Sequence, residues 1–460
     1  MHFRRTKWRH RAWKKAASLR IHDRLHTQKP MKRPSFPAYP DRSGFNALLP
    51  PRAACAEAKG DISADHVVVG AGYTGLAAAR RLAEIQPQAR IMVIEATEIG
   101  EGSSGRNSGF ASPRDLPAGP NTADLQHAEA LNRFTEEGWA WLMAPIEQNG
   151  IDCGLQRSGR IKAAATDLGA KQVRALGAAV KAAGLPHQLW DRNALQERIG
   201  TSYYQCALYT EEGYLLDPAA LIRGLADTLP ANIALHENTP LLSMQRRDKW
   251  YLETPLACIT APSVIMATNA AIRHFGRLRD RLVTMYTYAA LSEPLNAKDA
   301  LHLGSMPVWG LLPSHRLGTT VRRVGPDRLL VRSMYAHERP VTASRVRETL
   351  LSCFQRRYPG LAHNGLDQVW GGTTALTMNG APWWGQVEEG LYTSAGCNGA
   401  GIVKGSILGK RLAELALGHC KENEVRATWG LANWVAPEPF RSIGFNVIAA
   451  RERRLAGLEA

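Results

Sequence analysis

The chain has 460 residues and a formal net charge of +16, and 45% of its residues are apolar. This length and composition supply material for two or three globular lobes. No apolar stretch approaches the roughly 18 residues that a membrane-spanning helix requires, so we expect a soluble protein. The seven cysteines and fourteen histidines are dispersed, without a CxxC pair. This dispersal argues against a disulfide scaffold and a zinc site, predicts no metal, and suggests a reducing cytoplasm.

Much of the positive charge lies at the start of the chain. Residues 1–33 hold twelve Lys or Arg against one Asp, which accounts for +11 of the net charge. An unpatterned basic run is typical of a solvated, disordered arm. Binding to RNA or anionic lipid, a transit peptide, and a true start at Met31 are the alternatives. We expect no specific nucleic-acid partner, and a weak contact of this tract with the inner face of a membrane stays open.

The predicted elements begin after a lead-in at 34–60. This stretch is rich in proline and alanine, so residues 1–60 are expected to form a disordered extension. A strand at 66–69, a glycine turn, a helix to about residue 84 and a strand ending at Glu95 then form a βαβ unit. Helices follow at 122–148 and 168–183, each stopped by a glycine. The rest is predicted as a small antiparallel layer near 232–270, β-rich chain at 282–332, a helix at 344–357 and a last helix at 402–417.

The turn VVVGAGYTGL has the GxGxxG spacing of a dinucleotide-binding site. One glycine permits the tight turn, the next lets the backbone approach a pyrophosphate, and the third lets the helix pack on the strand. Glu95 lies twenty residues beyond the last of them, where a carboxylate accepts hydrogen bonds from a ribose and repels a 2′-phosphate. The motif alone does not separate FAD from NAD. The residues predicted to hold this half of the cofactor are Gly70, Gly72, Tyr73, Thr74, Gly75, Glu95 and Ala96.

The segment EATEIGEGSSGRNSGF, which starts at Glu95, resembles the corresponding segment of the D-amino-acid-oxidase-like superfamily of FAD-dependent oxidoreductases. That superfamily includes glycine oxidase, sarcosine oxidase and D-amino acid dehydrogenase. Within the segment, GxSGRN is similar to the gamma-glutamylputrescine oxidoreductase branch. The resemblance implies that this stretch wraps the pyrophosphate and the flavin edge. The FAD contacts implied here are Ser103, Ser104, Gly105, Arg106 and Asn107.

Further matches run in family order from about residue 61 to residue 420. The stretch VIMATNAAIR resembles the loop over the adenosine side, and TALTMNGAPWWG resembles a segment near the flavin ring, with Asn379 where an Asp is usual. The stretch GLYTSAGCNGAGIVKG resembles the turn and helix start that face the pyrimidine end of the flavin. No cysteine occupies the covalent-attachment position, so FAD is expected to be non-covalent. The implied contacts are Ala267, Thr268, Asn269, Gly396, Asn398, Gly399 and Gly401.

The resemblance implies an α/β fold in which a Rossmann-like FAD-binding domain is interleaved with an α+β substrate domain built on an antiparallel sheet. The expected boundaries are 61–115, 205–275 and 367–420 for the FAD-binding domain, and 116–204 and 276–366 for the substrate domain. Residues 421–460 are expected to form a tail that packs on the FAD-binding domain.

The resemblance also implies oxidation of the carbon–nitrogen bond of a small amine or amino acid by hydride transfer to flavin N5, giving an imine that hydrolyses. The family grips carboxylates with an arginine, and Arg322 or Arg323 is the nearest match, although paired arginines beside a turn are more often exposed. Tyrosines on these strands are equally consistent with half-buried packing residues. The candidate substrate-facing residues are Tyr286, Tyr288, Arg322, Arg323 and Tyr335.

The electron acceptor is expected to be oxygen or a quinone-linked electron-transfer chain. The stretch WGLLPSHRLGTTVRR lacks the lysine that oxidase members hold over the flavin, which favours a dehydrogenase. Two other functions stay open: an NAD-linked Rossmann dehydrogenase, and a flavin-stabilised protein that binds RNA or lipid through the basic arm.

Overall fold

The computed structural model describes Tyr39 and residues 41–460. The basic tract at 1–33, and every interpretation proposed for it, lies outside the described residues. None of the helices between residues 41 and 460 combines the length and the apolar run needed to cross a bilayer.

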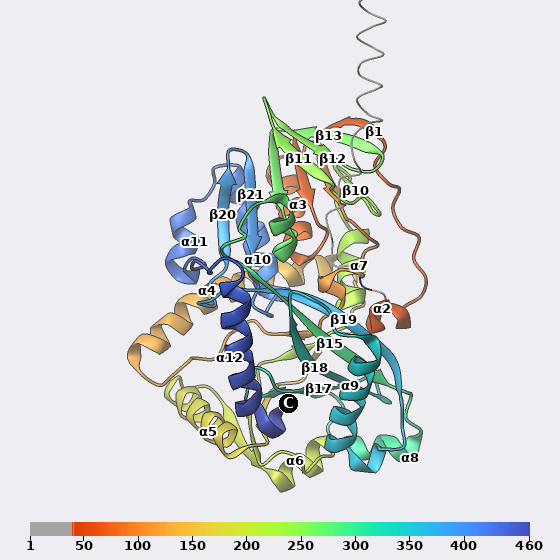
Figure 1. Ribbon diagram of the computed structural model, residues 1–460, viewed down its shortest axis with the longest axis vertical. Helices are drawn as coiled ribbons and strands as arrows, with labels where there is room; N and C mark the ends of the chain where they lie inside the picture. The colour runs from red at the N-terminus through yellow and green to blue at the C-terminus, as the bar shows by residue number, and fades with distance from the viewer. Residues whose placement is uncertain (1–38, 40) are drawn as a thin grey trace, which may run out of the picture. The chain divides into compact units, whose positions relative to one another are not determined.

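A six-stranded sheet contains the predicted βαβ unit (Figure 1). Its order is β10-β3-β2-β14-β21-β20, and all neighbours are parallel except β20 and β21. Strands β2 and β3 are buried along their whole length, as a parallel sheet covered on both faces requires. The Rossmann-like part of the fold is confirmed. The strands are β2 (His66–Val69), β3 (Ile91–Ile94), β10 (Ile233–His236), β14 (Ser263–Met266), β20 (Trp383–Glu388) and β21 (Leu391–Ala395).

Helices pack around this sheet and enclose one apolar core. Helix α3 (Tyr73–Ile85) lies side by side with α10 (Ile402–Ala416), as Figure 1 shows. Helices α4 (Thr122–Asn149) and α7 (Pro218–Asp227) contribute further residues to the same core. Helix α4 ends at Gly150, whose left-handed conformation closes the last turn as predicted.

An eight-stranded sheet forms the second layer, in the order β19-β15-β18-β17-β16-β6-β8-β7. Its neighbours are antiparallel except β16 and β6, so the predicted antiparallel sheet is confirmed. Helices α6 (Arg192–Ile199) and α9 (Ala343–Arg357) pack on one face, and α5 (Asp167–Ala182) and α8 (Ala297–Ala300) lie beside it. The strands are β6 (Arg160–Ala164), β7 (His187–Asp191), β8 (Cys206–Thr210), β15 (Val283–Ser292), β16 (Gly310–Pro313), β17 (Thr320–Val324), β18 (Arg328–His337) and β19 (Leu366–Leu376).

Two small sheets complete the architecture. A four-stranded sheet has the order β1 (Gly60–Ser63), β13 (Ala257–Ala261), β12 (Trp250–Glu253) and β11 (Ser243–Arg246), and a three-stranded sheet joins β4 (Phe110–Ala111), β9 (Tyr214–Leu215) and β5 (Gln156–Arg157). Two expected domain boundaries need correction, because β8 and β19 were assigned to the FAD-binding domain but pair within the eight-stranded sheet. Register with a distant partner strand decides this placement, and local sequence does not encode it.

The segment at 41–60 is packed, which corrects the expectation of a disordered extension for this part of the chain. Helix α2 (Gly44–Leu48) buries Phe45 edge-on against Trp370, with 6.0 Å between ring centroids. Arg52 forms an ion pair with the buried Glu237, with 2.6 Å between the guanidinium nitrogen and the carboxylate oxygen. The prolines correctly predicted irregular backbone. Composition alone did not predict that Phe45 and Arg52 pack against distant residues.

The C-terminal segment divides between the two layers, which corrects the expectation that all of 421–460 packs on the FAD-binding part. Helix α11 (Glu422–Trp429) contacts β20. Helix α12 (Phe440–Ala456) and η5 (Gly457–Glu459) instead reach the eight-stranded sheet, where the Glu459 carboxylate accepts the amides of Ala165 and Thr166 just after β6. Because Glu459 is buried, these bonds fix the end of the chain.

The buried ion pair of Arg52 and Glu237 generates a stability prediction. Burial opposes ionisation of Glu237, but the amides of Cys55 and Ile99 and the Arg52 guanidinium hold its pKa below the usual range. Arg52→Ala leaves this carboxylate without a counter-charge and should lower the free energy of unfolding by about 3 kcal/mol in urea titrations.

A second arginine variant separates the loss of the buried ion pair from the loss of one positive charge. The exposed pair of Arg90 and Asp65 is the control, and Arg90→Ala should cost about 0.5 kcal/mol or less. A carboxyl with a lowered folded pKa stabilises above its unfolded pKa and loses that contribution as pH falls through the folded value. The difference between wild type and Arg52→Ala should therefore shrink in acid, and equal stability at neutral pH would contradict the prediction.

Candidate functional site

The glycine turn has the close backbone packing that a dinucleotide site needs. Gly70 is left-handed at φ +99°, and a Cβ on Gly75 would lie 1.8 Å from the Gly70 carbonyl oxygen. A Cβ on Gly72 would lie 2.6 Å from Oγ of Ser104. Helix α3 starts at Tyr73 without a side-chain cap from Gly72, and the Tyr73 amide donates to Oγ of Ser104 at 3.3 Å, which leaves the next amides of the first turn to an anion at the turn.

Glu95 stands directly after β3, beside this turn. Its Oε2 accepts the Ala71 amide at 2.9 Å and its Oε1 accepts the Thr97 amide at 3.2 Å. Burial raises the pKa of Glu95, although these amides favour the carboxylate. Ala96 follows in the same bend. Thr74 lies where α3 contacts α10, because a Cβ on Gly409 would clash with the Thr74 carbonyl oxygen.

The segment η1 (Ser103–Gly105) forms a second wall against the turn. The Ser104 carbonyl accepts the Tyr73 hydroxyl at 3.0 Å and the Asn107 side-chain amide at 2.7 Å. Asn107 also accepts the Gly109 amide at 2.8 Å. The structure thus brings together three residues that were predicted around the cofactor from two separate motifs.

Arg106 lies beneath this wall with its side chain 2% exposed. Its guanidinium pairs with Glu101 at 2.9 Å and donates to the carbonyl oxygens of Asp41, Glu101 and Gly371. Its donors therefore join three chain segments, and its predicted contact with the cofactor stays a prediction. Glu101 was missed from the sequence, although an acid five residues before a motif arginine is a usable signal for a buried partner.

Tyr39 is a second residue that sequence reasoning missed. Its hydroxyl accepts the Thr373 amide at 3.0 Å and lies 2.8 Å from the Thr373 hydroxyl and 3.3 Å from Oγ of Ser103. The guanidinium carbon of Arg106 lies 4.1 Å from the centroid of its ring. Tyr39 therefore ties η1 to the edge strand β19 across the predicted cofactor site. No local motif marks this residue, which stands in a proline-rich stretch.

The loop before α10 closes the other end of the site. Asn269 is left-handed at φ 49°, and its side-chain oxygen accepts the Gly396 amide at 2.9 Å. Asn398, at φ 53°, accepts the Thr377 amide at 2.9 Å and donates to the Gly380 carbonyl at 2.8 Å. Both asparagines thus fix loops through their own side chains, in a conformation that non-glycine residues rarely adopt.

Open space and unpartnered groups remain where the resemblance places FAD. Helix α10 begins after Gly401 without a side-chain cap, and a Cβ on Gly399 would meet nothing within 4 Å. Ala267 continues the sheet by donating to the Val69 carbonyl at 2.8 Å, and next to it the buried hydroxyl of Thr268 has no hydrogen-bond partner among the described residues. Two helix starts without a side-chain cap, a carboxylate beside the turn and an unpartnered buried hydroxyl suit a dinucleotide with a flavin.

The eight-stranded sheet presents one face to these segments. Leu330 packs with Phe45 and Ala219, whereas its neighbour Val331 packs in the core with α9. Because side chains alternate along a strand, Arg332 shares the cofactor-side face with Leu330. A register shift between β15 and β18, with Met334 left-handed at φ 59°, then brings Tyr335 to this face as well.

Arg332 and Tyr335 form a pair on this face. The guanidinium donates to the Tyr335 hydroxyl at 3.2 Å, with 5.3 Å from the guanidinium carbon to the ring centroid. No carboxylate among the described residues forms an ion pair with Arg332. Lys162 also lies on the face away from α9, and burial followed by the charge of Arg160 lowers its pKa.

The other candidate tyrosines lie on the opposite face. Tyr288 is buried in the α9-side core, and its hydroxyl accepts the Val341 amide at 2.6 Å. Tyr286 packs against the same core. The structure therefore does not bring Tyr286 and Tyr288 together with Tyr335, and their contact with substrate stays a prediction.

The candidate arginines Arg322 and Arg323 donate hydrogen bonds to backbone carbonyl oxygens. Arg322 is buried and donates to Ser108 and Leu216, both at 2.7 Å, and this burial lowers its pKa to about 10. Arg323 projects to the other face and donates to Met306 at 3.0 Å. Sequence spacing could not tell these structural arginines from the unpaired Arg332, because their partners come from distant loops.

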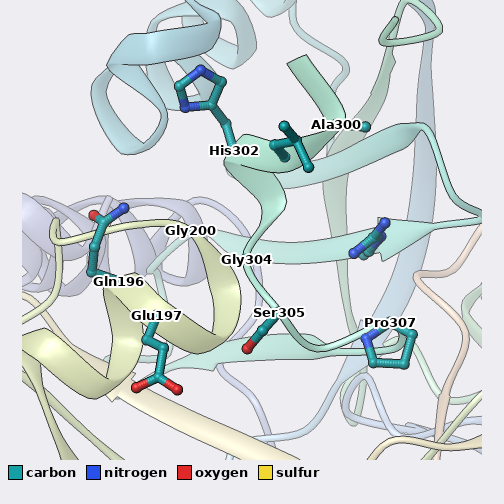
Figure 2. A pocket seen from close by; sticks show the side chains of 10 residues that line it. Gln196, Glu197, Gly200, Ala300, His302, Gly304, Ser305 and Pro307 are labelled. Atoms are coloured by element: carbon teal, nitrogen blue, oxygen red, sulfur yellow. The ribbon is translucent and has the colours of Figure 1, made fainter. Parts of the chain in front are cut away.

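Arg323 belongs to a cavity of about 550 Å³ beside α6, shown in Figure 2. Polar side chains from α6 and the chain after α8 line it, among them Gln196, Glu197, His302 and Ser305. This cavity is separate from the face that carries Arg332.

Comparison with known proteins agrees with this geometry. The family model for FAD dependent oxidoreductases (DAO) matches residues 65–415. A probable oxidoreductase OrdL of Rhizobium meliloti (strain 1021) is 27% identical over 84% of this chain and 90% of its own. The gamma-glutamylputrescine oxidoreductase of Escherichia coli (strain K12) is 26% identical over 85% of this chain and 93% of its own. The crystal structure of glycine oxidase from Geobacillus kaustophilus superposes with a TM-score of 0.66 at 22% identity, covering 78% of this chain and 96% of its own.

The bridge made by Tyr39 predicts a change in cofactor retention. Tyr39→Phe removes the hydroxyl that bonds both Ser103 and Thr373, leaves their direct contact at 3.2 Å, and keeps the ring over Arg106. One neutral hydrogen bond contributes about 1 kcal/mol, so FAD should dissociate about fivefold faster, as measured by recovery of flavin fluorescence after dilution.

The matched control is Tyr251→Phe. The Tyr251 hydroxyl bonds Asp248 in the four-stranded sheet, away from η1 and β19. Equal FAD dissociation rates for wild type and Tyr39→Phe would show that the bridge does not retain the cofactor.

Proposed function

The chain belongs to the DAO family of FAD-dependent oxidoreductases, and we propose that it oxidises the carbon–nitrogen bond of a small amine that carries a carboxylate, such as an amino acid. The observation that supports this substrate class is the cofactor-side pair of Arg332 and Tyr335. The names of two similar proteins, gamma-glutamylputrescine oxidoreductase and glycine oxidase, also point to amine substrates.

Arg332 supplies the charge that a carboxylate needs. A guanidinium presents a planar fork of donors that suits bidentate recognition. Arg106, Arg322 and Arg323 donate to carbonyls or carboxylates, whereas no carbonyl or carboxylate among the described residues is bonded to Arg332. The Tyr335 hydroxyl, 3.2 Å away, accepts from the guanidinium and donates to the Gly318 carbonyl at 3.4 Å, so it would orient the guanidinium for a carboxylate.

The surroundings favour an anionic group and disfavour a second cation. Lys162 adds positive charge to the same face, and its ammonium is already disfavoured by burial and by Arg160. A substrate ammonium entering this field would lose its proton more readily, which gives the neutral amine that oxidation requires. FAD, when bound, supplies the acceptor for hydride from the carbon next to nitrogen. The imine then hydrolyses in water to a carbonyl compound.

The electron acceptor that regenerates the flavin is the second part of the proposal. The stretch before Arg322 contains no lysine, which favours a dehydrogenase that passes electrons to a quinone-linked chain over direct reaction with oxygen. The electron acceptor can be identified by comparing the rate at which the reduced flavin is reoxidised in air with the rate at which a soluble quinone reoxidises it. Faster reoxidation in air would favour the oxidase.

The proposal predicts the substrate preference of the reduction half-reaction. In an anaerobic screen, amino acids should bleach the visible flavin absorbance, whereas the corresponding decarboxylated amines should react at least tenfold more slowly because Arg332 has nothing to bind. Equal rates for the amino acids and the decarboxylated amines would show that the enzyme does not recognise a substrate carboxylate. Absence of bleaching by D-amino acids, N-methyl amino acids and polyamine derivatives would overturn the function itself.

Arg332→Met should raise KM for a carboxylate-bearing substrate and lower kcat/KM by about 10- to 100-fold, because a hydrogen bond to a charged group contributes about 1.5–3 kcal/mol. Arg323→Met is the matched comparison, since Arg323 lies on the other face beside the α6 cavity. A large loss with Arg323→Met and none with Arg332→Met would assign the carboxylate to Arg323.

A further inference from the structure

The outward side of helix α12 carries an apolar stripe. Phe440, Ile443 and Val447 are 67%, 59% and 66% exposed, and Ile448 beside them is also exposed. The spacing of Phe440, Ile443 and Val447 by three and four residues places these three in one row on the helix, with Ile448 at its edge. Large apolar side chains exposed singly are ordinary, but a contiguous row marks an interaction surface.

The inward side of the same helix shows the reverse composition. Phe445 stacks on His337 with 4.2 Å between ring centroids, and Glu452 lies 2.9 Å from Arg316 and 3.2 Å from His315. The fully buried positions, Ala449 and Ala456, are small. Polar bonds, alanines and the stack of Phe445 on His337 therefore attach α12 to the eight-stranded sheet, while the large aliphatic residues face outward. A helix that needed only its own chain for burial would show the opposite arrangement.

The stripe continues into positive charge. Arg451 follows Val447 by one turn, and Arg454 follows Arg451 by three residues, so both extend the same row. Neither forms an ion pair within the described part of the chain, and both are exposed. Glu452, the only acidic residue in α12, points inward. Trp434, just before the helix, is exposed as well.

We propose that this outward face of α12, made of Phe440, Ile443, Val447, Ile448, Arg451 and Arg454, docks on the surface of an anionic lipid bilayer. Aliphatic and aromatic side chains enter the boundary between headgroups and acyl chains, while arginines one or two turns away pair with phosphates. The charge favours lipid over a second copy of the chain, because two chains of net charge +16 repel each other whereas anionic headgroups attract both arginines. The inference does not depend on the substrate proposal.

The inner side of α12 connects this surface to the candidate site. Arg453 donates to the Tyr335 carbonyl at 3.4 Å, and Phe445 covers His337, two residues further along β18. Docking through α12 would therefore set the eight-stranded sheet beside the bilayer. A lipid-soluble acceptor of electrons would then be available close to the enzyme.

The test is co-sedimentation of the full-length, FAD-loaded protein with vesicles of phosphatidylglycerol and phosphatidylcholine, against vesicles of phosphatidylcholine alone. Binding should require phosphatidylglycerol and weaken with salt. Each basic residue near such a surface contributes a roughly fivefold factor, so R451Q with R454Q should reduce partitioning about 30-fold. I443S with V447S should reduce it comparably at constant charge.

The control is L256S with L301S, which removes two exposed leucines from the β12–β13 turn and from η3 (Leu301–Leu303). All variants change exposed side chains, and an unchanged flavin spectrum confirms that they fold. Undiminished binding by both α12 variants would overturn the proposal and assign any binding to charge elsewhere, including the basic residues 1–33. A dimer that the α12 variants abolish, without vesicle binding, would overturn it in favour of self-association.

Discussion

Buried guanidinium groups that donate to backbone carbonyls join the eight-stranded sheet to the segments that follow η1 and β9. Arg322 extends from β17 to the carbonyls of Ser108 and Leu216, and Arg106 extends from the segment after η1 to Gly371 on β19. A buried cation is costly unless its donors are satisfied, so each arginine fixes the separation of the segments it joins. The predicted cofactor residues 103–107 and the strands that carry Arg322 and Arg332 are positioned by these bonds.

Strained backbone conformations concentrate around the same region. Asn269, Asn398 and Met334 adopt positive φ at the loop after β14, at the turn before α10 and at the bulge in β18. Each such conformation costs of order 1–3 kcal/mol and persists only where surrounding bonds determine it. The two asparagines have those bonds in their own side chains, and Met334 has the register shift between β15 and β18. That shift places Tyr335 next to Arg332, so a local irregularity creates the candidate substrate contact.

The sequence predicted what local spacing encodes. The glycine turn, the acid after β3, the strand pattern and the helix starts and stops all follow from backbone conformation within some thirty residues, and family resemblance supplied the cofactor. Contacts between distant segments were inaccessible. Arg322, Arg323 and Arg332 look alike on neighbouring strands, and only the loops that meet them separate two structural arginines from an available one. Tyr39 shows the same limit, because its partners lie on η1 and β19.

The C-terminal segment attaches to the eight-stranded sheet by one side of α12 and exposes the other. Glu459 is buried, and its carboxylate and carbonyl bond the chain at Ala165 and Thr319, so the end of the chain is anchored by polar groups. Burial of large aliphatic side chains is therefore not what attaches α12 to the eight-stranded sheet; polar groups, two alanines and the Phe445 stack on His337 do. The aliphatic residues of its outer face add nothing to that attachment and would lower solubility if they stayed in water. No residue among 41–460 buries them, and the two arginines in the same row favour the proposed partner, a surface that carries negative charge.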